Sequence, residues 1–233
     1  MIEISKALSI IKRETKPLGS ESVRLSRSVG RILAEDVFAD SDMPPFDRSQ
    51  MDGYAMKARD TRNAPVDLKL VGESAAGRGW HRVLKEGEAI RIMTGARVPE
   101  GADAIQKIEL TSESGDVVTI KEATTKSKYI VRRGAEIKKG ARLFRPGEVI
   151  DERMIASLAA FGYPEVQVSY APRVSILGTG SEIVAVEKQP GEDQIRNSNS
   201  VMLKAMCERV GAVARVLPQA GDHLTKLKSV IAS

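Results

Sequence analysis

The most constraining feature of the chain is a change of hydrophobic period near its middle. Residues 66–72 alternate apolar and polar side chains, as a half-buried strand does. Further on, residues 104–110 and 117–121 flank Ser114-Gly115-Asp116, which is typical of a hairpin turn. Several short strands separated by turn residues predict a small β barrel or sandwich, which we place at residues 46–138.

Helical periods flank this β region. Residues 150–159 carry apolar side chains on one helical face, and Asp151 is the expected N-cap. The same spacing occurs near the start of the chain, at Ile4, Leu8 and Ile11. We therefore expect residues 1–45 and 139–171 to form one split α/β domain around the β insert.

A third pattern begins at residue 172. A short apolar strand is followed by a glycine loop, a helix capped by Ser198 or Asn199, a second strand, and a helix capped by Asp222. This order predicts the start of a doubly wound parallel sheet in residues 172–233, and therefore an α/β multidomain protein. Two parallel strands leave exposed edges, so we expect either a fragment or a partner that completes the sheet.

Composition narrows the class of protein. The hydrophobic content of 42% and charged content of 29% are typical of a soluble globular protein, and no apolar run is long enough for a membrane span. The start of the chain lacks a secretion-signal pattern, and the single cysteine, Cys207, favours a reducing compartment such as the cytoplasm. With two histidines and one cysteine, any metal is expected to be a hard cation bound by carboxylates.

A basic cluster lies between residues 126 and 145. It contains one acid, Glu136, against Lys126, Lys128, Arg132, Arg133, Lys138, Lys139, Arg142 and Arg145. Such a cluster attracts phosphates and other anions, and a solvated face with surface salt bridges is the alternative. No aromatic platform interleaves with its charges, since Tyr129 and Phe144 are the only aromatic residues in it, and no known binding motif is present, so we do not expect nucleic acid as a partner.

The loop at residues 44–55 is a candidate site. Two prolines make its start extended, and Phe46 and Tyr54 are apolar anchors on either side of a run of polar residues. Gly53 permits a turn that would hold the Asp52 carboxylate in one direction, where it could bind a hard cation or orient a ligand. The alternative is a proline-rich linker followed by an ordinary Asp-Gly turn.

Two further strand ends carry candidate residues. Thr94 follows an apolar strand, where a hydroxyl beside backbone N–H groups suits an oxyanion; a strand-terminating turn is the alternative. The loop at residues 178–182 lacks the third glycine of a dinucleotide motif, but it lies at a strand end of an open sheet, where ligands bind. Glu182 would project into that crevice, and Asp222 follows the next strand, with helix capping as its alternative role.

Four motifs carry a resemblance to the molybdopterin molybdenumtransferase family, which includes bacterial MoeA and the C-terminal domain of gephyrin. They are residues 44–55 (PPFDRSQMDGYA), 90–104 (IRIMTGARVPEGADA), 132–137 (RRGAEI) and 178–182 (GTGSE), in the family's order. The resemblance implies an elongated arrangement of the three predicted domains. The family's later third-domain loops and its fourth β domain are absent from this sequence, which favours a truncated chain.

The resemblance also assigns roles to residues. It implies catalytic roles for Asp52, Thr94 and Glu182, and magnesium binding by Asp52, Glu182 and Asp222. The substrate- or cofactor-binding residues that it implies are Ser49, Arg132, Arg133, Glu136, Gly178, Thr179, Gly180 and Asp222. Glu136 departs from the family, which usually has an Asp there, preceded by an acid where this chain has Ala135.

The activity that the resemblance implies is magnesium-dependent insertion of molybdenum from molybdate into adenylylated molybdopterin, with release of AMP. It implies a homodimer, because the family's cleft lies between the third domain of one subunit and the second domain of the other. It also implies contacts with the molybdopterin adenylyltransferase and with molybdoenzyme targets. Two alternatives stay open: a non-catalytic pterin-binding or scaffold module, and a general anion-binding or regulatory domain that shares only the β insert.

Overall fold

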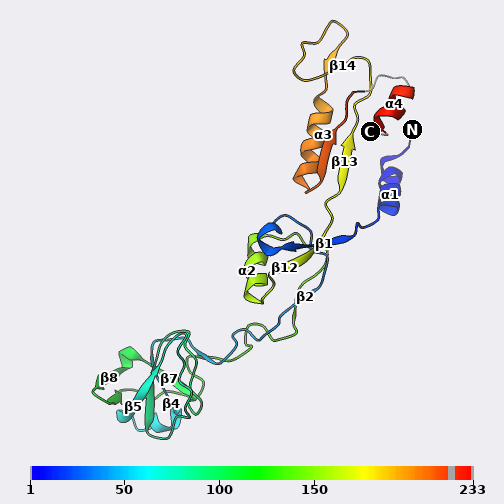
Figure 1. Ribbon diagram of the computed structural model, residues 1–233. Helices are drawn as coiled ribbons and strands as arrows, with labels where there is room; N and C mark the ends of the chain where they lie inside the picture. Colours follow the sequence, from blue (N-terminus) through cyan, green and yellow to red (C-terminus); the bar gives the residue numbers. More distant parts are fainter. Residues whose placement is uncertain (1, 220–223, 232–233) are drawn as a thin grey trace. The chain divides into compact units, whose positions relative to one another are not determined.

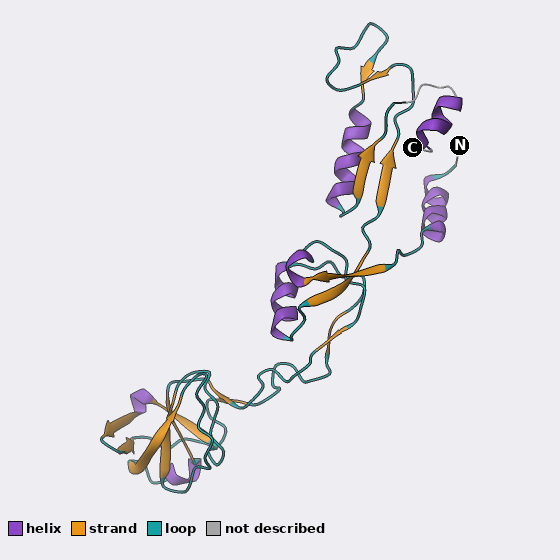
Figure 2. Ribbon diagram, viewed as in Figure 1, coloured by secondary structure: helices purple, strands orange, loops and turns teal. Residues whose placement is uncertain are grey.

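The computed structural model describes residues 2–219 and 224–231. The chain forms two compact units, one made of Val37–Leu143 and one made of residues 1–36 together with 144–233 (Figures 1 and 2). The unit Val37–Leu143 is called the β unit here, and the other is called the α/β unit. The division into three domains with bounds at residues 46, 138 and 171 stays a prediction.

A six-stranded sheet forms the β unit. Its strand order is β7-β4-β6-β5-β9-β8, and every neighbouring pair is antiparallel except β5 with β6. The strands are β4 (Gly53–Met56), β5 (Val66–Ser74), β6 (Glu88–Ile92), β7 (Ala104–Lys107), β8 (Thr111–Ser114) and β9 (Val117–Ile120). The expected β insert is therefore confirmed as a strand-rich unit.

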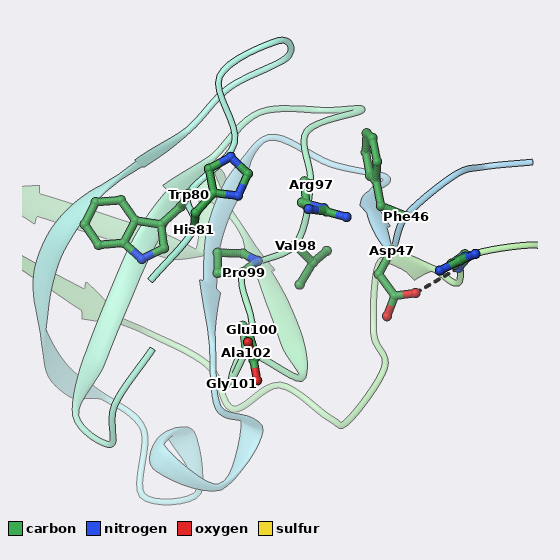
Figure 3. A pocket seen from close by; sticks show the side chains of 11 residues that line it. Phe46, Asp47, Trp80, His81, Arg97, Val98, Pro99, Glu100, Gly101 and Ala102 are labelled. Atoms are coloured by element: carbon green, nitrogen blue, oxygen red, sulfur yellow. Dashed lines mark hydrogen bonds between the residues drawn. The ribbon is translucent and has the colours of Figure 1, made fainter. Parts of the chain in front are cut away.

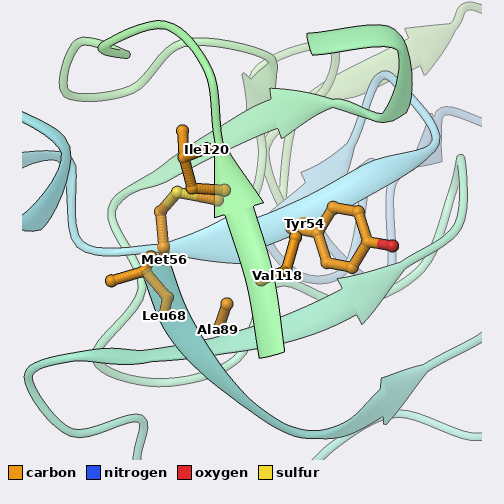
Figure 4. Close-up of a cluster of buried hydrophobic side chains, with 6 residues drawn as sticks. All are labelled: Tyr54, Met56, Leu68, Ala89, Val118 and Ile120. Atoms are coloured by element: carbon orange, nitrogen blue, oxygen red, sulfur yellow. The ribbon is translucent and has the colours of Figure 1, made fainter. Parts of the chain in front are cut away.

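Strand β4 lies in the middle of the hydrophobic core. Alternate residues of a strand point to opposite faces of the sheet, so Tyr54 and Met56 enter one cluster while Ala55 enters another. Figure 4 shows the first cluster, in which Tyr54 and Met56 pack with Leu68, Ala89, Val118 and Ile120. The second cluster joins Ala55 to Ile92, Ala96, Ile105 and Ile130. Burial on both faces fixes the position of the loop that precedes β4.

Shorter elements complete the β unit. Strand β3 (Arg48–Ser49) pairs antiparallel with β10 (Ile130–Val131), and β2 (Val37–Phe38) pairs with β11 (Arg142–Phe144). Two 3₁₀ turns occur, η2 (Ala58–Thr61) and η3 (Ile108–Leu110). The hairpin around Gly115 joins β8 to β9, so its first strand begins at Thr111 and not within residues 104–110.

The α/β unit begins with α1 (Ile4–Glu14), β1 (Ser20–Arg24) and η1 (Leu25–Arg27). Strand β1 pairs antiparallel with β12 (Glu165–Ser169), which follows helix α2 (Glu152–Ala160). The carboxylate of Asp151 accepts a hydrogen bond from the backbone N–H of Met154 at 2.8 Å, which confirms the predicted N-cap.

The last part of this unit contains a parallel strand pair, as predicted. Strand β13 (Arg173–Ile176) pairs in parallel with β16 (Val213–Val216). Between them lie β14 (Ile183–Val184), β15 (Ile195–Arg196) and α3 (Ser198–Arg209), and α4 (Leu224–Ile231) follows. The N-cap of α3 is Asn197, whose side chain accepts from the N–H of Ser200 at 3.1 Å, so the expected caps Ser198 and Asn199 are wrong. Across residues 2–219 and 224–231, no helix has the length and apolar character needed to cross a membrane.

Candidate functional site

Two predicted site residues meet at neighbouring strand ends of the β unit. Strands β4 and β6 are antiparallel with Gly53 opposite Ile92, so the residue before β4 lies beside the residues after β6. Asp52 Oδ1 accepts hydrogen bonds from the backbone N–H of Thr94 at 2.6 Å and from its hydroxyl at 2.8 Å. The structure thus brings Asp52 and Thr94 together on an exposed surface.

These bonds set the charge state of Asp52. The backbone hydrogen bond from Thr94, followed by the hydroxyl hydrogen bond, lowers the pKa of the Asp52 carboxyl below its usual value. Both bonds end on Oδ1, and among the described residues no hydrogen bond reaches Oδ2. One oxygen of an ionised carboxylate is therefore available to solvent, which is the donor that a hard cation such as Mg²⁺ prefers.

Gly53 is required for a different reason from the predicted turn. It is the first residue of β4 and does not have a positive φ. A Cβ at this position would lie 2.0 Å from the carbonyl oxygen of Gln106 on the neighbouring strand β7. Only glycine allows the two backbones to approach this closely, and their approach fixes the backbone next to Asp52.

Ser49 stabilises the candidate loop from inside. Its side chain is fully buried, and its hydroxyl donates to the carbonyl of Met51 at 2.5 Å. Its backbone N–H donates to Ala96 and its carbonyl accepts from Gly95, both at 2.9 Å. These bonds hold the segment before Asp52 against the segment after Thr94. The predicted contact of Ser49 with a substrate stays a prediction.

Acidic side chains pair with the arginines of the basic cluster. Arg132 contacts Asp47 at 2.5 Å, and Arg133 contacts Asp42 at 2.6 Å. Asp47 also accepts from the backbone N–H of Arg133 at 2.8 Å. Burial raises the pKa of Asp47, but the hydrogen bonds from Arg133 and Arg132 outweigh burial, so the pKa is lowered overall. The arginines are thereby fixed in position, and phosphate binding by them stays a prediction.

Glu136 lies in the same cluster of loops. Its carboxylate accepts from the guanidinium of Arg48 at 2.9 Å, and its backbone N–H donates to Met43 at 3.0 Å. Arg48 lies within the loop at residues 44–55 and Met43 directly precedes it, so the third motif is packed against the first. The role of Glu136 in substrate binding stays a prediction.

The fourth motif lies in the α/β unit, after strand β13. Gly180 has φ +126, and a Cβ there would lie 2.5 Å from a carboxylate oxygen of Glu182, so the acid folds back over the glycine. The amide of Gln219 donates to the carbonyl of Gly180 at 2.8 Å and closes the loop. Gly178 precedes this turn and lies against the side chain of Asn197, the N-cap of α3. Thr179 lies between the two glycines.

The predicted metal set is not assembled within the described chain. Asp52 belongs to the β unit and Glu182 to the α/β unit, while Asp222 lies outside the described residues. Among residues 2–219 and 224–231, no three His, Cys, Asp or Glu side chains gather in a group that could hold a metal ion. Convergence of Asp52, Glu182 and Asp222 on one cation therefore stays a prediction.

Two adjoining pockets of the β unit were not predicted from the sequence. The first, of about 410 Å³, is drawn in Figure 3, and the second has about 480 Å³. Phe46, His81 and Arg97 line both. Sequence reasoning treated Phe46 only as an anchor and found no partner for His81; the position of Arg97 inside the second motif was the one available signal.

A solved structure shows the class of fold. The crystal structure of molybdopterin biosynthesis MoeA protein from Pyrococcus horikoshii OT3 is similar to the whole of this chain, with a TM-score of 0.90 and 31% sequence identity. The match covers 100% of this chain and 63% of that chain. The α/β multidomain fold with a β insert is therefore the MoeA fold.

Sequence comparisons identify the family. Residues 2–162 match the family described as the MoeA N-terminal region (domain I and II), and the chain belongs to that family. A relative named molybdopterin molybdenumtransferase from Staphylococcus aureus (strain Mu50) is 35% identical over 96% of this chain and 54% of its own length. The protein of the same name from Staphylococcus epidermidis (strain ATCC 35984) is 34% identical over 99% of this chain and 56% of its own length. The chain thus spans about half the length of these relatives.

Proposed function

We propose that this chain takes part in molybdenum cofactor biosynthesis, as the portion of a molybdopterin molybdenumtransferase that carries the Asp52–Thr94 pair. The reaction is insertion of molybdenum from molybdate into adenylylated molybdopterin, with release of AMP and dependence on Mg²⁺. The family match and the names of the relatives support the substrate class. The contact between Asp52 and Thr94 is the structural observation that carries the proposal.

The residues of the pair have separable roles. Asp52 is ionised, is held by Thr94, and has one oxygen available for a cation. A bound Mg²⁺ would offset the charge of the substrate phosphates and polarise the bond that is cleaved. Thr94 keeps the carboxylate in one orientation, so that the cation position does not depend on a mobile side chain.

The complete site is proposed to form between two copies of the protein. Asp52 and Glu182 belong to different units of the chain, and a homodimer cleft of the kind that the resemblance implies would bring Asp52 of one copy to Glu182 of the other. Adenylylated molybdopterin would be received from the molybdopterin adenylyltransferase, and the product delivered to molybdoenzymes. Sedimentation velocity on the purified chain tests the dimer. A single monomeric species at about 100 µM, far above a dissociation constant of about 1 µM, contradicts it.

The experiment that tests the activity is AMP release from adenylylated molybdopterin, measured with and without molybdate and Mg²⁺. Asp52→Asn is expected to lower the rate at least about tenfold, because it removes the ionised ligand. Asp67→Asn is a matched control, since Asp67 also accepts from a threonine hydroxyl, that of Thr119 at 2.6 Å, on another part of the sheet. Equal loss in both variants contradicts a special role for Asp52.

A second function is favoured by one observation: among residues 2–219 and 224–231, no three His, Cys, Asp or Glu side chains gather in a group that could hold a metal ion. In this alternative the chain is a non-catalytic module that binds the pterin. The same assay separates the two functions. Binding of adenylylated molybdopterin without any AMP release identifies the module, and molybdate-dependent release identifies the enzyme.

A further inference from the structure

Arg97 has a guanidinium group available for a ligand. Its backbone carbonyl accepts from the hydroxyl of Ser74 at 2.8 Å, and Ser74 is fully buried, so the main chain here is fixed. Its guanidinium lies over the ring of Phe46, 5.1 Å from the centroid. In the part of the chain that the structure describes, no carboxylate pairs with Arg97, whereas Arg48 and Arg132 each have one.

The second pocket, called the slot here, has walls that suit a flat ligand. Six of its nine lining residues are glycine or alanine, and the others are Phe46, His81 and Arg97. Backbone and Cβ atoms therefore form most of its surface, and the rings of Phe46 and His81 lie at its edge. The loop that forms one wall is closed by paired backbone hydrogen bonds between Ala75 and Arg78, at 3.1 and 3.0 Å. A volume of about 480 Å³ lies within the usual range for small-molecule sites.

Charge separates the slot from the first pocket. The first pocket contains two acids, Asp47 and Glu100, in addition to Arg97 and Arg133. Arg97 is the only Lys, Arg, Asp or Glu among the residues that line the slot. In Figure 3, Arg97 lies between the rings of His81 and Phe46, at the edge shared by the two pockets. An anionic group is therefore attracted to the mouth of the slot, beside an apolar flat interior.

We propose that the slot binds a flat nitrogen heterocycle whose phosphate contacts Arg97. Resting on the proposed function, this ligand is one half of the adenylylated pterin, since both the adenosine half and the pterin half combine a flat heterocycle with a phosphate. The slot holds the ring between the Gly77 loop and Phe46, and the guanidinium donates to the phosphate oxygens. This adds a substrate-positioning site next to the Asp52–Thr94 pair, because Gly95 and Ala96 of the slot directly follow Thr94.

The test is calorimetric titration of the 233-residue chain with four probes: AMP, 6-hydroxymethylpterin monophosphate, adenosine and inorganic phosphate. AMP and 6-hydroxymethylpterin monophosphate each represent one half of the substrate. The one that matches the half in the slot is expected to bind at least about tenfold more tightly than adenosine or phosphate alone. Arg97→Met keeps an aliphatic chain over Phe46 and removes the charge. It is expected to weaken the binding of the phosphorylated ligand by about 10- to 100-fold and to leave the affinity for adenosine unchanged. Trp80, the single tryptophan, lines the adjoining pocket and reports AMP binding by fluorescence.

Two variants complete the design. Arg78→Ala is the matched control, because Arg78 belongs to the same loop but pairs with Glu73 in solvent and does not line the slot. It is expected to bind all probes like the unmodified chain. Ala76→Phe fills the slot and is expected to abolish binding of the ring ligand, with thermal unfolding measured to establish that the variant is folded.

The outcomes separate this inference from the proposed function. Equal affinity of the phosphorylated ligand for the unmodified chain and Arg97→Met overturns the inference, as does the absence of binding of both phosphorylated probes at millimolar concentration. Slot binding that depends on Arg97, in a chain without molybdate-dependent AMP release, supports the inference and contradicts the proposed activity.

Discussion

Gly53→Ala tests the close approach of strands β4 and β7. The new Cβ would lie 2.0 Å from the carbonyl oxygen of Gln106, and real Cβ contacts are essentially never shorter than 3.0 Å. The obstacle is backbone within a sheet, so relief requires one strand to move. Overpacking in a core costs about 1 to 3 kcal/mol, and a rigid obstacle places this substitution near about 3 kcal/mol.

The assay is urea unfolding followed by the fluorescence of Trp80, which lies in the same unit as Gly53. With a slope of about 1 to 3 kcal/mol per molar urea, the midpoint is expected to fall by about 1 to 3 M. Gly79→Ala is the control, because its Cβ would meet Arg97 at an ordinary 3.5 Å and its φ is not positive. Its expected change is within about 1 kcal/mol. Coinciding midpoints for the two variants would refute the reasoning.

The remaining predictions concern the site, the core and a helix cap. Thr94→Val removes one of the two bonds to Asp52, so the pKa of Asp52 is expected to rise yet stay below its usual value; carboxyl NMR titration measures it, and an unchanged pKa contradicts the assignment. Burial, then the hydrogen bond to Glu113, raises the pKa of Tyr54 to about 12, against about 10 in an unfolded chain. The Tyr54 contribution to stability is therefore complete below about pH 10 and is lost as the pH rises toward 12, and Tyr54→Phe is expected to show a smaller alkaline loss in thermal unfolding. Asn197→Ala is expected to destabilise α3 by about 1 kcal/mol and Ser198→Ala by less than about 0.5 kcal/mol, measured by circular dichroism; the reverse order would restore Ser198 as the cap.

Local patterns predicted much of the fold. Alternation in residues 66–72 indicated β5, and the helical spacing after Asp151 indicated α2 with its cap. These elements depend on neighbours a few residues apart, so the hydrophobic period of the sequence predicts them directly. The N-cap of α3 was predicted one or two residues too late in the chain, because Asn197, Ser198 and Asn199 are all suitable capping residues.

The site depended on the register of strands that are far apart in sequence. The Asp52–Thr94 contact joins residues 42 positions apart, and Arg132 finds Asp47 across 85 positions. A motif could nominate these residues, but it could not show that an acid fixes each arginine or that Arg97 has no carboxylate partner in the described chain. The slot likewise combines three segments, around Phe46, Gly77 and Ala96.

The sequence by itself therefore determined the kinds of elements, their order and the family, because period and motif are local properties of the chain. Only the tertiary structure shows why residue 53 is a glycine and which charged groups have no ion-pair partner in the described chain and can bind a ligand. The physical reason is that steric exclusion and ion pairing act through space at a few ångströms, and only the register of the folded sheet sets which distant residues come that close.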